Sequence, residues 1–395
     1  MKYDFSVSNY AQLWGTRGNG KKLLASLVED KELIGLNESW YLTQGSIDPS
    51  YTPSDDKGLA TFTVMERELT ASQMANLRAP LADTNTMDAT GFNSYSASIP
   101  DFSTPKIVET AMMREQKERI FEQMEGNDAV IMKTQYIPNV QKLLQSMNFT
   151  MNWMTGKLMT TGKIVYDKGQ GIFAPVHKAD IPVENFVNAG TTAWTDPSAK
   201  IITEMQRIEG EFRSKWGYNG GMQWQMTRNF FLNCFIKNNE VVEKVNEYRT
   251  LLKLFTVSFN NINTNIFNEA WEDIRNAYGL SAIVLVEEKE YDRNKETGEK
   301  TAIQGWDDKF VVLRPTGDAV TFMRKEILDT TYAKYLNKST SRNFAPINNG
   351  LGTLVNTTVP SGLYNEWHTQ IMFSCVPALV EFTKHIIVDV TKTNS

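Results

Sequence analysis

The chain has 395 residues, too many for one ordinary core and enough for two or three lobes, and its 41% hydrophobic and 22% charged residues are typical of a globular protein. Its formal net charge of −5 gives no reason to expect general, sequence-independent binding of nucleic acid, which needs a basic surface. The two cysteines, Cys234 and Cys375, lie far apart, which argues against a disulfide framework or a zinc site and favours a reducing cytosol.

Residues 1–58 are predicted to form an N-terminal arm. They contain one short helix at about Lys21–Asp30, followed by a turn-rich stretch that Pro49, Pro53 and Gly58 interrupt. The start of the chain lacks the apolar core of a signal peptide, and no uncharged apolar run approaches the ~18 residues that a membrane helix needs. We therefore expect a soluble, cytosolic product with no membrane partner.

Residues 59–103 are predicted to form an extended loop. Alternation in Thr61–Glu66 is typical of a half-buried strand, but the sequence that follows is polar, weakly periodic and too long for an ordinary connection. It nevertheless carries large side chains that need a partner surface: Met74, Leu77, Leu81, Met87, Phe92 and Tyr95. We interpret this segment as a loop that becomes ordered against a neighbour.

The strongest helical pattern lies at about 138–161, after a predicted charged surface helix at Val108–Glu125. Pro138 suits the first turn of this helix, and Gly162 is placed to end it. Between them, apolar residues recur at steps of three and four and form one stripe: Val140, Leu144, Met147, Met151, Met154 and Leu158. At ~1.5 Å per residue the helix would be over ~30 Å long, so we expect it to act as a spine for sheets.

The stretch Trp194-Thr195-Asp196-Pro197 is predicted to be a domain junction. The residue before a proline disfavours helical geometry, so Asp196 suits the N-cap of a helix whose first residue is Pro197. The carboxylate is then explained by capping, and Trp194 has no other titratable neighbour in sequence that would indicate an active site.

The remaining segments mix strands with helices. Strands are predicted at 163–167, within 172–186, at 221–227, on both sides of a charged excursion in 281–317, and as two runs in 369–390. Helices are predicted at 229–238, 240–255 and 267–279. Because separate helices and antiparallel hairpins occur without an internal repeat, the sequence predicts an α+β fold.

Few motifs in the sequence indicate a catalytic, nucleotide-binding or metal-binding site. Gly15–Lys22 matches most of a phosphate-binding loop, but Lys22 occupies the position of the Mg²⁺-binding hydroxyl and no buried strand precedes the loop. Asp292–Gly298 resembles a calcium loop only loosely and is better explained as the tip of a β-hairpin. The histidines have no metal-ligand spacing: His177, His368 and His385. We therefore predict no catalytic residue, no cofactor-binding residue and no metal site.

Short motifs follow one another along the predicted elements. MANLRAPLADTNTM (Met74–Met87) and SIPDFSTPKIVET (Ser98–Thr110) lie in the loop and at its exit, and TGKLMTTGKIVYD (Thr155–Asp167) ends the spine helix. AGTTAWTDPSAKIITEM (Ala189–Met205) covers the junction, and MFSCVPALVEFTKHIIVDV (Met372–Val390) closes the chain. Together with the strand and hairpin of 278–313, these stretches resemble the lambda-type major capsid family of tailed phages over about residues 60–390.

The resemblance implies the Hong Kong 97-type capsid fold. It places the N-terminal arm at 1–58, the extended loop at 59–103, a peripheral domain at 104–194, an axial domain at 195–337 and a return to the peripheral domain at 338–395. It also implies a major capsid protein of a tailed bacteriophage or prophage, which forms the hexamers and pentamers of an icosahedral shell around double-stranded DNA without catalysis. Copies of the chain would cover the loop, and Trp194, Asp196 and Pro197 would mark the domain junction.

The implied partners are other copies of the chain, a scaffolding protein, a portal, a possible decoration protein and packaged DNA contacted non-specifically. The implied location is the virion, with assembly in the cytoplasm of the bacterial host. Two alternatives remain open: another virion structural protein, from a tail or neck, and a nucleotide-binding enzyme that uses Gly15–Lys22.

Overall fold

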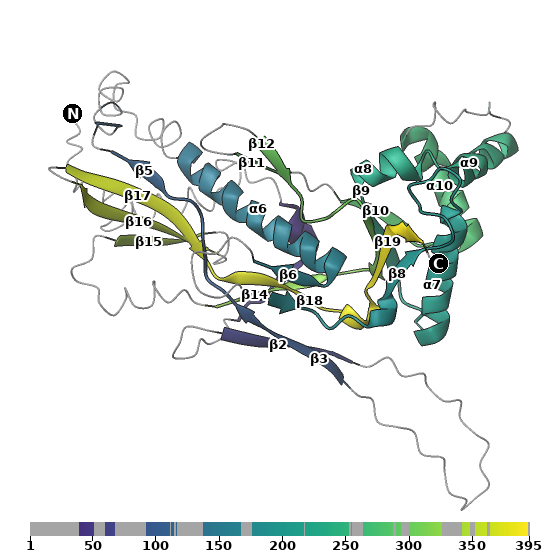
Figure 1. Ribbon diagram of the computed structural model, residues 1–395, viewed down its shortest axis with the longest axis horizontal. Coiled ribbons are helices and arrows are strands. Elements are labelled where there is room, and N and C mark those ends of the chain that lie inside the picture. Colours follow the sequence, from purple (N-terminus) through teal and green to yellow (C-terminus); the bar gives the residue numbers. More distant parts are fainter. Residues whose placement is uncertain are drawn as a thin grey trace, which may run out of the picture. The chain divides into compact units, whose positions relative to one another are not determined.

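The computed structural model describes residues 39–50, 60–67, 92–110, 112–113, 116, 137–166, 176–216, 218–252, 254, 264–286, 290–293, 300–325, 342–347, 352–361 and 364–393. Helices and strands both contribute substantially, so the predicted α+β class is confirmed (Figure 1). Contacts divide the chain into two compact units. The first comprises Met1–Phe62, Ser98–Met154 and Phe322–Pro377, and the second comprises Thr63–Ala97, Thr155–Thr321 and Ala378–Ser395.

The first unit contains an antiparallel sheet in the order β15–β16–β17–β4, with β5 also paired to β17. Its long hairpin of β16 and β17 has a register that runs from Gly352 opposite Phe373 to Ser361 opposite Tyr364. Phe102 of β4 stacks on Phe373 with ring centroids 5.0 Å apart. The strand bounds are β4 Phe102–Ser103, β5 Ile107–Glu109, β15 Arg342–Ile347, β16 Gly352–Ser361 and β17 Tyr364–Phe373.

A three-stranded sheet has the order β1–β14–β18. Its strands are β1 Gly45–Ile47, β14 Val320–Arg324 and β18 Cys375–Leu379. A 3₁₀ helix, η1 Trp40–Thr43, precedes β1. The ring of Tyr41 packs edge-on against Phe322 with centroids 5.2 Å apart, so η1 contributes to the core of the first unit.

The spine helix α6 runs from Ile137 to Thr161, one residue longer at its start than the predicted 138–161. Every residue of the predicted apolar stripe is buried, with exposed fractions of 0–5%. Burying one such side chain contributes about 1.5–3 kcal/mol, which explains why a sequence rich in methionine holds a long helix. Polar side chains add specificity, because Asn152 Oδ1 accepts from the Tyr41 amide at 3.0 Å and Asn148 Oδ1 from the Tyr41 hydroxyl at 3.3 Å.

The second unit is built on a mixed sheet in the order β10–β9–β13–β19–β8. β10 runs parallel to β9 and β8 runs parallel to β19, whereas β13 is antiparallel to both β9 and β19. The bounds are β8 Phe186–Ala189, β9 Met222–Thr227, β10 Ala282–Val286, β13 Phe310–Pro315 and β19 Ile386–Thr393. Short 3₁₀ helices precede β8 and β19, η3 Val183–Asn185 and η7 Phe382–Lys384.

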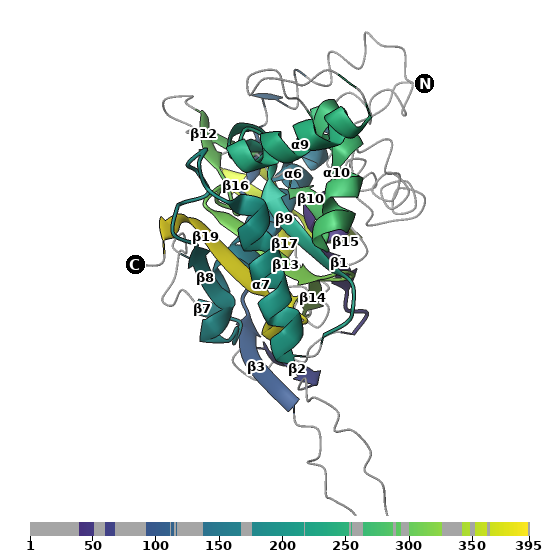
Figure 2. The same cartoon turned by 90° about the vertical axis from the view of Figure 1, so that its right-hand side faces the viewer.

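Helices cover this sheet and share one apolar core with it (Figure 2). Ile208 and Phe212 of α7 belong to the same cluster as Trp224 and Leu313 of the sheet. A stacked pair, Phe267 and Trp271 of α10, extends the core with ring centroids 5.0 Å apart. The helices are α7 Ile201–Trp216, α8 Arg228–Phe230, the π-helical turn η4 Phe231–Phe235, α9 Asn239–Leu251 and α10 Thr264–Tyr278.

Among the described residues, three further sheets have two strands each. They pair β2 Ala60–Arg67 with β3 Phe92–Ile99, β6 Lys163–Val165 with β7 Val176–Lys178, and β11 Glu290–Arg293 with β12 Lys300–Ile303. The antiparallel register of β11 and β12 confirms the predicted hairpin. Gly298, at the expected tip, lies outside the described residues.

The structure differs from the sequence prediction in several places. Ile107–Glu109 forms strand β5, so the helix predicted at Val108–Glu125 is wrong at its start, and most of the rest lies outside the described residues. Strand β3, at the end of the predicted loop, was not foreseen. The C-terminal strand β19 lies between β13 and β8, a pairing that the sequence does not predict. An apolar strand pattern reveals burial but not the partner strand.

Gly162 ends the spine helix, as its position predicts. Its φ of +67° lies in the left-handed region, and its amide donates to the Leu158 carbonyl at 2.9 Å. A Cβ at this position would lie 3.0 Å from Cδ1 of Ile181. Both the backbone and the neighbouring side chain therefore favour glycine here.

We expect Gly162→Ala to lower the free energy of unfolding by about 1–2 kcal/mol, because an alanine is strained at positive φ. Gly210→Ala is the matched control, since Gly210 lies within α7 and an added Cβ would meet no atom within 4 Å. That control should raise the free energy of unfolding by about 0.5–1 kcal/mol. Urea denaturation measures both, and equal effects of the two substitutions would contradict this account of the helix end.

Candidate functional site

The ionisable groups of the described residues do not form a reactive cluster. No group of His, Cys, Asp and Glu side chains within the described ranges could hold a metal ion. Burial lowers the pKa of His177 and of His385 to about 4, so both imidazoles are neutral at pH 7. His385 Nε2 lies 2.6 Å from the Met159 carbonyl near the end of α6, and His177 lies beside the ring of Tyr95. Both imidazoles therefore pack the interior of the second unit.

The two cysteines are free thiols. Cys375 is completely buried and Cys234 is partly buried, and in each case burial raises the pKa of the thiol. A nucleophilic cysteine requires the opposite shift, toward the thiolate. The cysteines therefore behave as small interior side chains.

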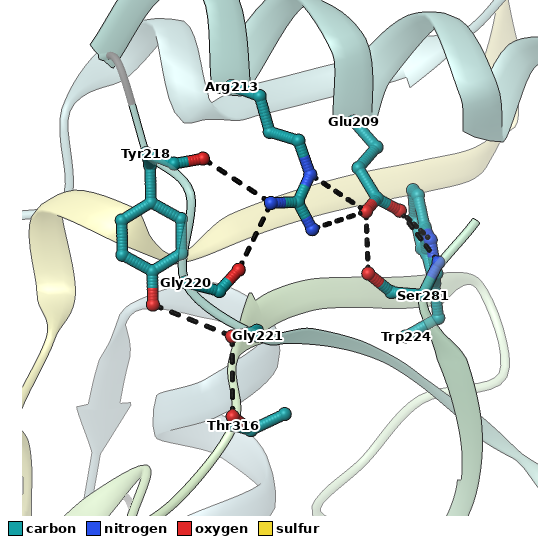
Figure 3. A network of polar contacts seen from close by, with 8 residues as sticks. All are labelled: Glu209, Arg213, Tyr218, Gly220, Gly221, Trp224, Ser281 and Thr316. Atoms are coloured by element: carbon teal, nitrogen blue, oxygen red, sulfur yellow. Dashed lines mark hydrogen bonds and ion pairs between the residues drawn. The ribbon is translucent and has the colours of Figure 1, made fainter. Parts of the chain in front are cut away.

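The most elaborate polar cluster surrounds Glu209 on α7, which is only 2% exposed (Figure 3). Glu209 Oε1 accepts from Arg213 Nη2 at 2.8 Å and from Ser281 Oγ at 2.6 Å. Glu209 Oε2 accepts from Trp224 Nε1 at 3.2 Å and from the Ser281 amide at 3.0 Å. The donors come from α7, from β9 and from the residue before β10, so the carboxylate joins the helix to the sheet.

Arg213 extends this cluster toward the loop before β9. Its Nη1 donates to the carbonyls of Tyr218 and Gly220, at 3.3 and 3.0 Å. The Gly221 carbonyl accepts from the Thr316 amide at 2.9 Å, which fixes the start of β9 beside the end of β13. Since each carboxylate oxygen already accepts two or more hydrogen bonds, Glu209 has no free lone pair for a substrate, and the cluster is structural.

The predicted junction at Trp194–Pro197 is a compact turn whose helix begins later than expected. α7 starts at Ile201, so Asp196 is not its N-cap. Asp196 Oδ1 instead accepts from the Ser198 amide at 2.8 Å and from its hydroxyl at 2.7 Å, which closes a local turn. The ring of Trp194 is buried, and its amide donates to Val390 of β19 at 2.9 Å.

The start of α7 is capped by residues from another helix. Glu240 of α9 accepts from the Ile202 amide at 2.8 Å and from the Thr203 hydroxyl at 2.5 Å. Asn238 donates to the carbonyls of Pro197 and Ala199, at 3.0 and 2.8 Å, and also caps α9 itself. A carboxylate at a helix N-terminus is favourable, which explains why a buried glutamate is tolerated there.

Strands β2 and β3 form a two-faced pair at the ends of the predicted loop. Thr63 Oγ1 and Ser96 Oγ lie 2.8 Å apart, so these side chains share one face. Side chains alternate along a strand, which places Met65 and Phe92 on that same face. Met65 and Phe92 are each 70% exposed, and this outer face with its two large apolar side chains is the candidate assembly surface.

The inner face of the same pair is held by the C-terminal part of the second unit. The Tyr95 hydroxyl donates to the Leu379 carbonyl at 2.9 Å, and its ring packs edge-on against Phe382 at 5.1 Å. Glu66 accepts from the Thr383 amide at 2.8 Å. Tyr95 was expected to need cover from another copy, and this is wrong because its own chain already buries it.

The remaining loop residues of the prediction lie outside the described residues: Met74, Leu77, Leu81 and Met87. The same holds for the phosphate-loop candidate, Gly15–Lys22. Sequence reasoning missed the buried polar residues Glu209, Asn238 and Glu240. A signal existed for Glu209, because it follows Met205 by four residues and therefore lies on the apolar side of α7.

Other exposed apolar side chains were also not predicted. Val183, before β8, is 84% exposed, and Leu251, Leu252 and Leu254 are exposed at the end of α9. Single apolar residues on a surface are common, so these carry less weight than the outer face of β2 and β3. None of the helices in the described ranges is long and apolar enough to cross a bilayer.

No protein-family model and no curated protein matches this sequence. Among solved structures, similar chains include a prophage protein from Escherichia coli CFT073, provisionally assigned as a capsid protein, with a TM-score of 0.47, 11% identity, and coverage of 93% of this chain and 98% of that chain. The mature capsid of bacteriophage PhiM1 gives a TM-score of 0.44 and 10% identity, covering 90% of this chain and 87% of that chain. The capsid of cyanophage P-SCSP1u gives a TM-score of 0.43 and 7% identity, covering 89% of this chain and 87% of that chain. At these identities and TM-scores, the likenesses alone establish no function.

We expect Glu209→Gln to lower the free energy of unfolding by about 2–4 kcal/mol. The amide nitrogen of the glutamine would face hydrogen-bond donors where an accepting oxygen is needed, and Arg213 would lose its charge partner. Glu211→Gln is the matched control on the same helix, where an exposed ion pair with Arg207 contributes at most about 1 kcal/mol. Urea denaturation of both variants measures the difference. A loss at position 209 no larger than at position 211 would rule out the structural role.

We also expect the free energy of unfolding to decrease as the pH falls from 6.5 to 4. In this range the unfolded chain binds protons at His177 and His385, whose pKa of about 4 keeps them neutral in the folded chain. Each histidine contributes a slope of at most about 1.4 kcal/mol per pH unit. Replacing His385 by Gln should reduce the slope measured by urea denaturation, and parallel curves for the two proteins would contradict its burial in the neutral form.

Proposed function

We propose that this protein is the major capsid protein of a tailed bacteriophage or prophage, and that copies of it form the hexamers and pentamers of an icosahedral shell around double-stranded DNA. The protein would act without catalysis and without a cofactor. The shell would be part of the virion and would be assembled in the cytoplasm of the bacterial host.

What carries this proposal is the arrangement at the ends of the extended loop. The inner face of β2 and β3 is fastened to residues 379–383 by Tyr95 and Glu66, whereas the outer face exposes Met65 and Phe92. The intervening residues 68–91 contain further apolar side chains in a polar sequence. A segment that is fixed at its base and apolar on its outside suits an interface with another copy, where such side chains are desolvated.

The order of elements along the chain also supports the proposal. The fastened loop, the spine helix α6 and the mixed sheet with helices α7, α9 and α10 follow one another as the resemblance implies. We assign the axial role to the lobe at about 195–337, which contributes β9, β10 and β13 to that sheet, and the peripheral role to the spine helix with its adjoining strands. Trp194, Asp196 and Pro197 would lie at the junction between them.

Further partners follow from this function. A scaffolding protein, a portal and possibly a decoration protein would join the copies of this chain, and packaged DNA would be contacted without sequence preference. The formal net charge of −5 fits such a weak contact, because a shell confines DNA without binding it tightly.

The test removes residues 68–91 of the loop and keeps strands β2 and β3 at its two ends. Deleting residues 68–91 and joining β2 to β3 by a short glycine–serine linker should leave the monomer folded, since Tyr95 and Glu66 remain in place. Shell formation should be lost, because the surface that reaches a neighbour is removed. Sedimentation velocity and negative-stain electron microscopy of the two proteins measure assembly, and circular dichroism measures folding.

Point substitutions supply the matched control. Phe92→Ser should change the free energy of unfolding by no more than about 0.5 kcal/mol, since the side chain is exposed, but should weaken assembly. Val183→Ser removes an apolar side chain elsewhere that is even more exposed, and this variant should assemble normally. Shells of normal yield from the loop deletion would refute the proposal, and tubes or rings from the unaltered protein would indicate a tail or neck component instead.

A further inference from the structure

The short ribbon of β6 and β7 carries an unusual pair of charges. The two strands are antiparallel, and Lys163 stands directly opposite Lys178 in their register. The central pair, Ile164 and His177, is buried, whereas both lysines are exposed. Directly opposite residues point to the same side of a strand pair, so both ammonium groups belong to the outer face of the ribbon.

Like charges directly opposite each other destabilise a strand pair. Neither lysine forms an ion pair with another of the described residues. The carboxylate nearest to Lys178 in sequence, Asp180, is exposed and forms no ion pair with either lysine. Among the residues that the structure describes, no carboxylate therefore compensates the repulsion.

The carboxyl end of the spine helix does not account for the lysines either. The Leu158 carbonyl accepts from the Gly162 amide at 2.9 Å, and the Met159 carbonyl lies 2.6 Å from His385 Nε2. The Lys157 carbonyl accepts from the Thr161 hydroxyl at 2.7 Å. These terminal carbonyls have donors that come from other residues, so the lysine ammonium groups remain available to a partner.

We propose that Lys163 and Lys178 together bind the phosphate backbone of the nucleic acid that the shell encloses. This inference rests on the proposed function. A phosphate group offers several oxygens to two ammonium groups at once, and a lysine is a point charge that binds phosphate without reading sequence. Because the chain has a net charge of −5, binding of phosphate depends on a local pair of positive charges. The contact is weak in one subunit, but many copies in a shell bind the same nucleic acid and so strengthen the overall binding.

The experiment compares two double variants that change the charge equally. Lys163→Gln with Lys178→Gln removes the pair, whereas Lys106→Gln with Lys200→Gln removes two other exposed lysines. Binding of the full-length protein to linear double-stranded DNA is measured by fluorescence anisotropy over a series of NaCl concentrations. Loss of the one phosphate contact that the two ammonium groups share should reduce the slope of log K against log salt by roughly 0.9, with at least a several-fold loss of affinity at low salt.

The outcomes separate this inference from the proposed function. An equal loss in the two double variants, or no loss in the first, overturns the assignment of the lysine pair. A first variant that binds DNA normally but fails to assemble overturns it as well, because the lysines would then face a carboxylate of another copy. Shell formation is scored separately by electron microscopy, so absence of shells in the unaltered protein contradicts the proposed function, while the binding comparison still tests the lysines.

Discussion

The buried carboxylate of Glu209 is the interaction on which the second unit depends. Removing a carboxylate from water costs several kcal/mol, and the cost is offset only when charged and neutral donors saturate its oxygens. Here the donors are Arg213 on the same helix, Trp224 in the sheet and Ser281 at the start of the parallel strand β10. The geometry of the donors therefore fixes where α7 lies on the sheet and where β10 begins.

The same logic operates at the start of α7. Glu240 and Asn238 satisfy backbone groups of the Trp194–Lys200 turn and of the first helical turn, so two helices and a turn share one set of hydrogen bonds. Trp194 and Trp224, whose ring centroids lie 6.3 Å apart, belong to the apolar core next to this turn. The polar groups specify the arrangement, and the aromatic core supplies most of the stabilisation.

Sequence reasoning succeeded where local periodicity and backbone chemistry decide the structure. The 3.6-residue stripe located α6 nearly to the residue, and Gly162 was placed correctly because only a residue that tolerates positive φ ends a helix in this way. It failed where distant partners decide. Asp196 could cap a helix or close a turn, and the partners of the turn and of the first helical turn, Asn238 and Glu240, come from a distant part of the sequence. Tyr95 seemed to need a neighbour because nothing in the sequence indicates Leu379 and Phe382 as its partners.

The assembly surface illustrates the same limit. Alternation within β2 and β3 shows that one face is covered and one is open, but the covered face could be recognised only after the C-terminal segment had been placed against it. Met65 and Phe92 then remain exposed apolar side chains among the described residues. In the proposed shell, another copy of the chain would cover this outer face of β2 and β3.

Cryo-electron microscopy of the purified, concentrated full-length protein tests the central claim most directly. The account predicts closed shells of hexamers and pentamers, in which a neighbouring copy covers Met65 and Phe92. Dispersed monomers under all assembly conditions, or particles in which these two side chains remain exposed to solvent, would contradict it.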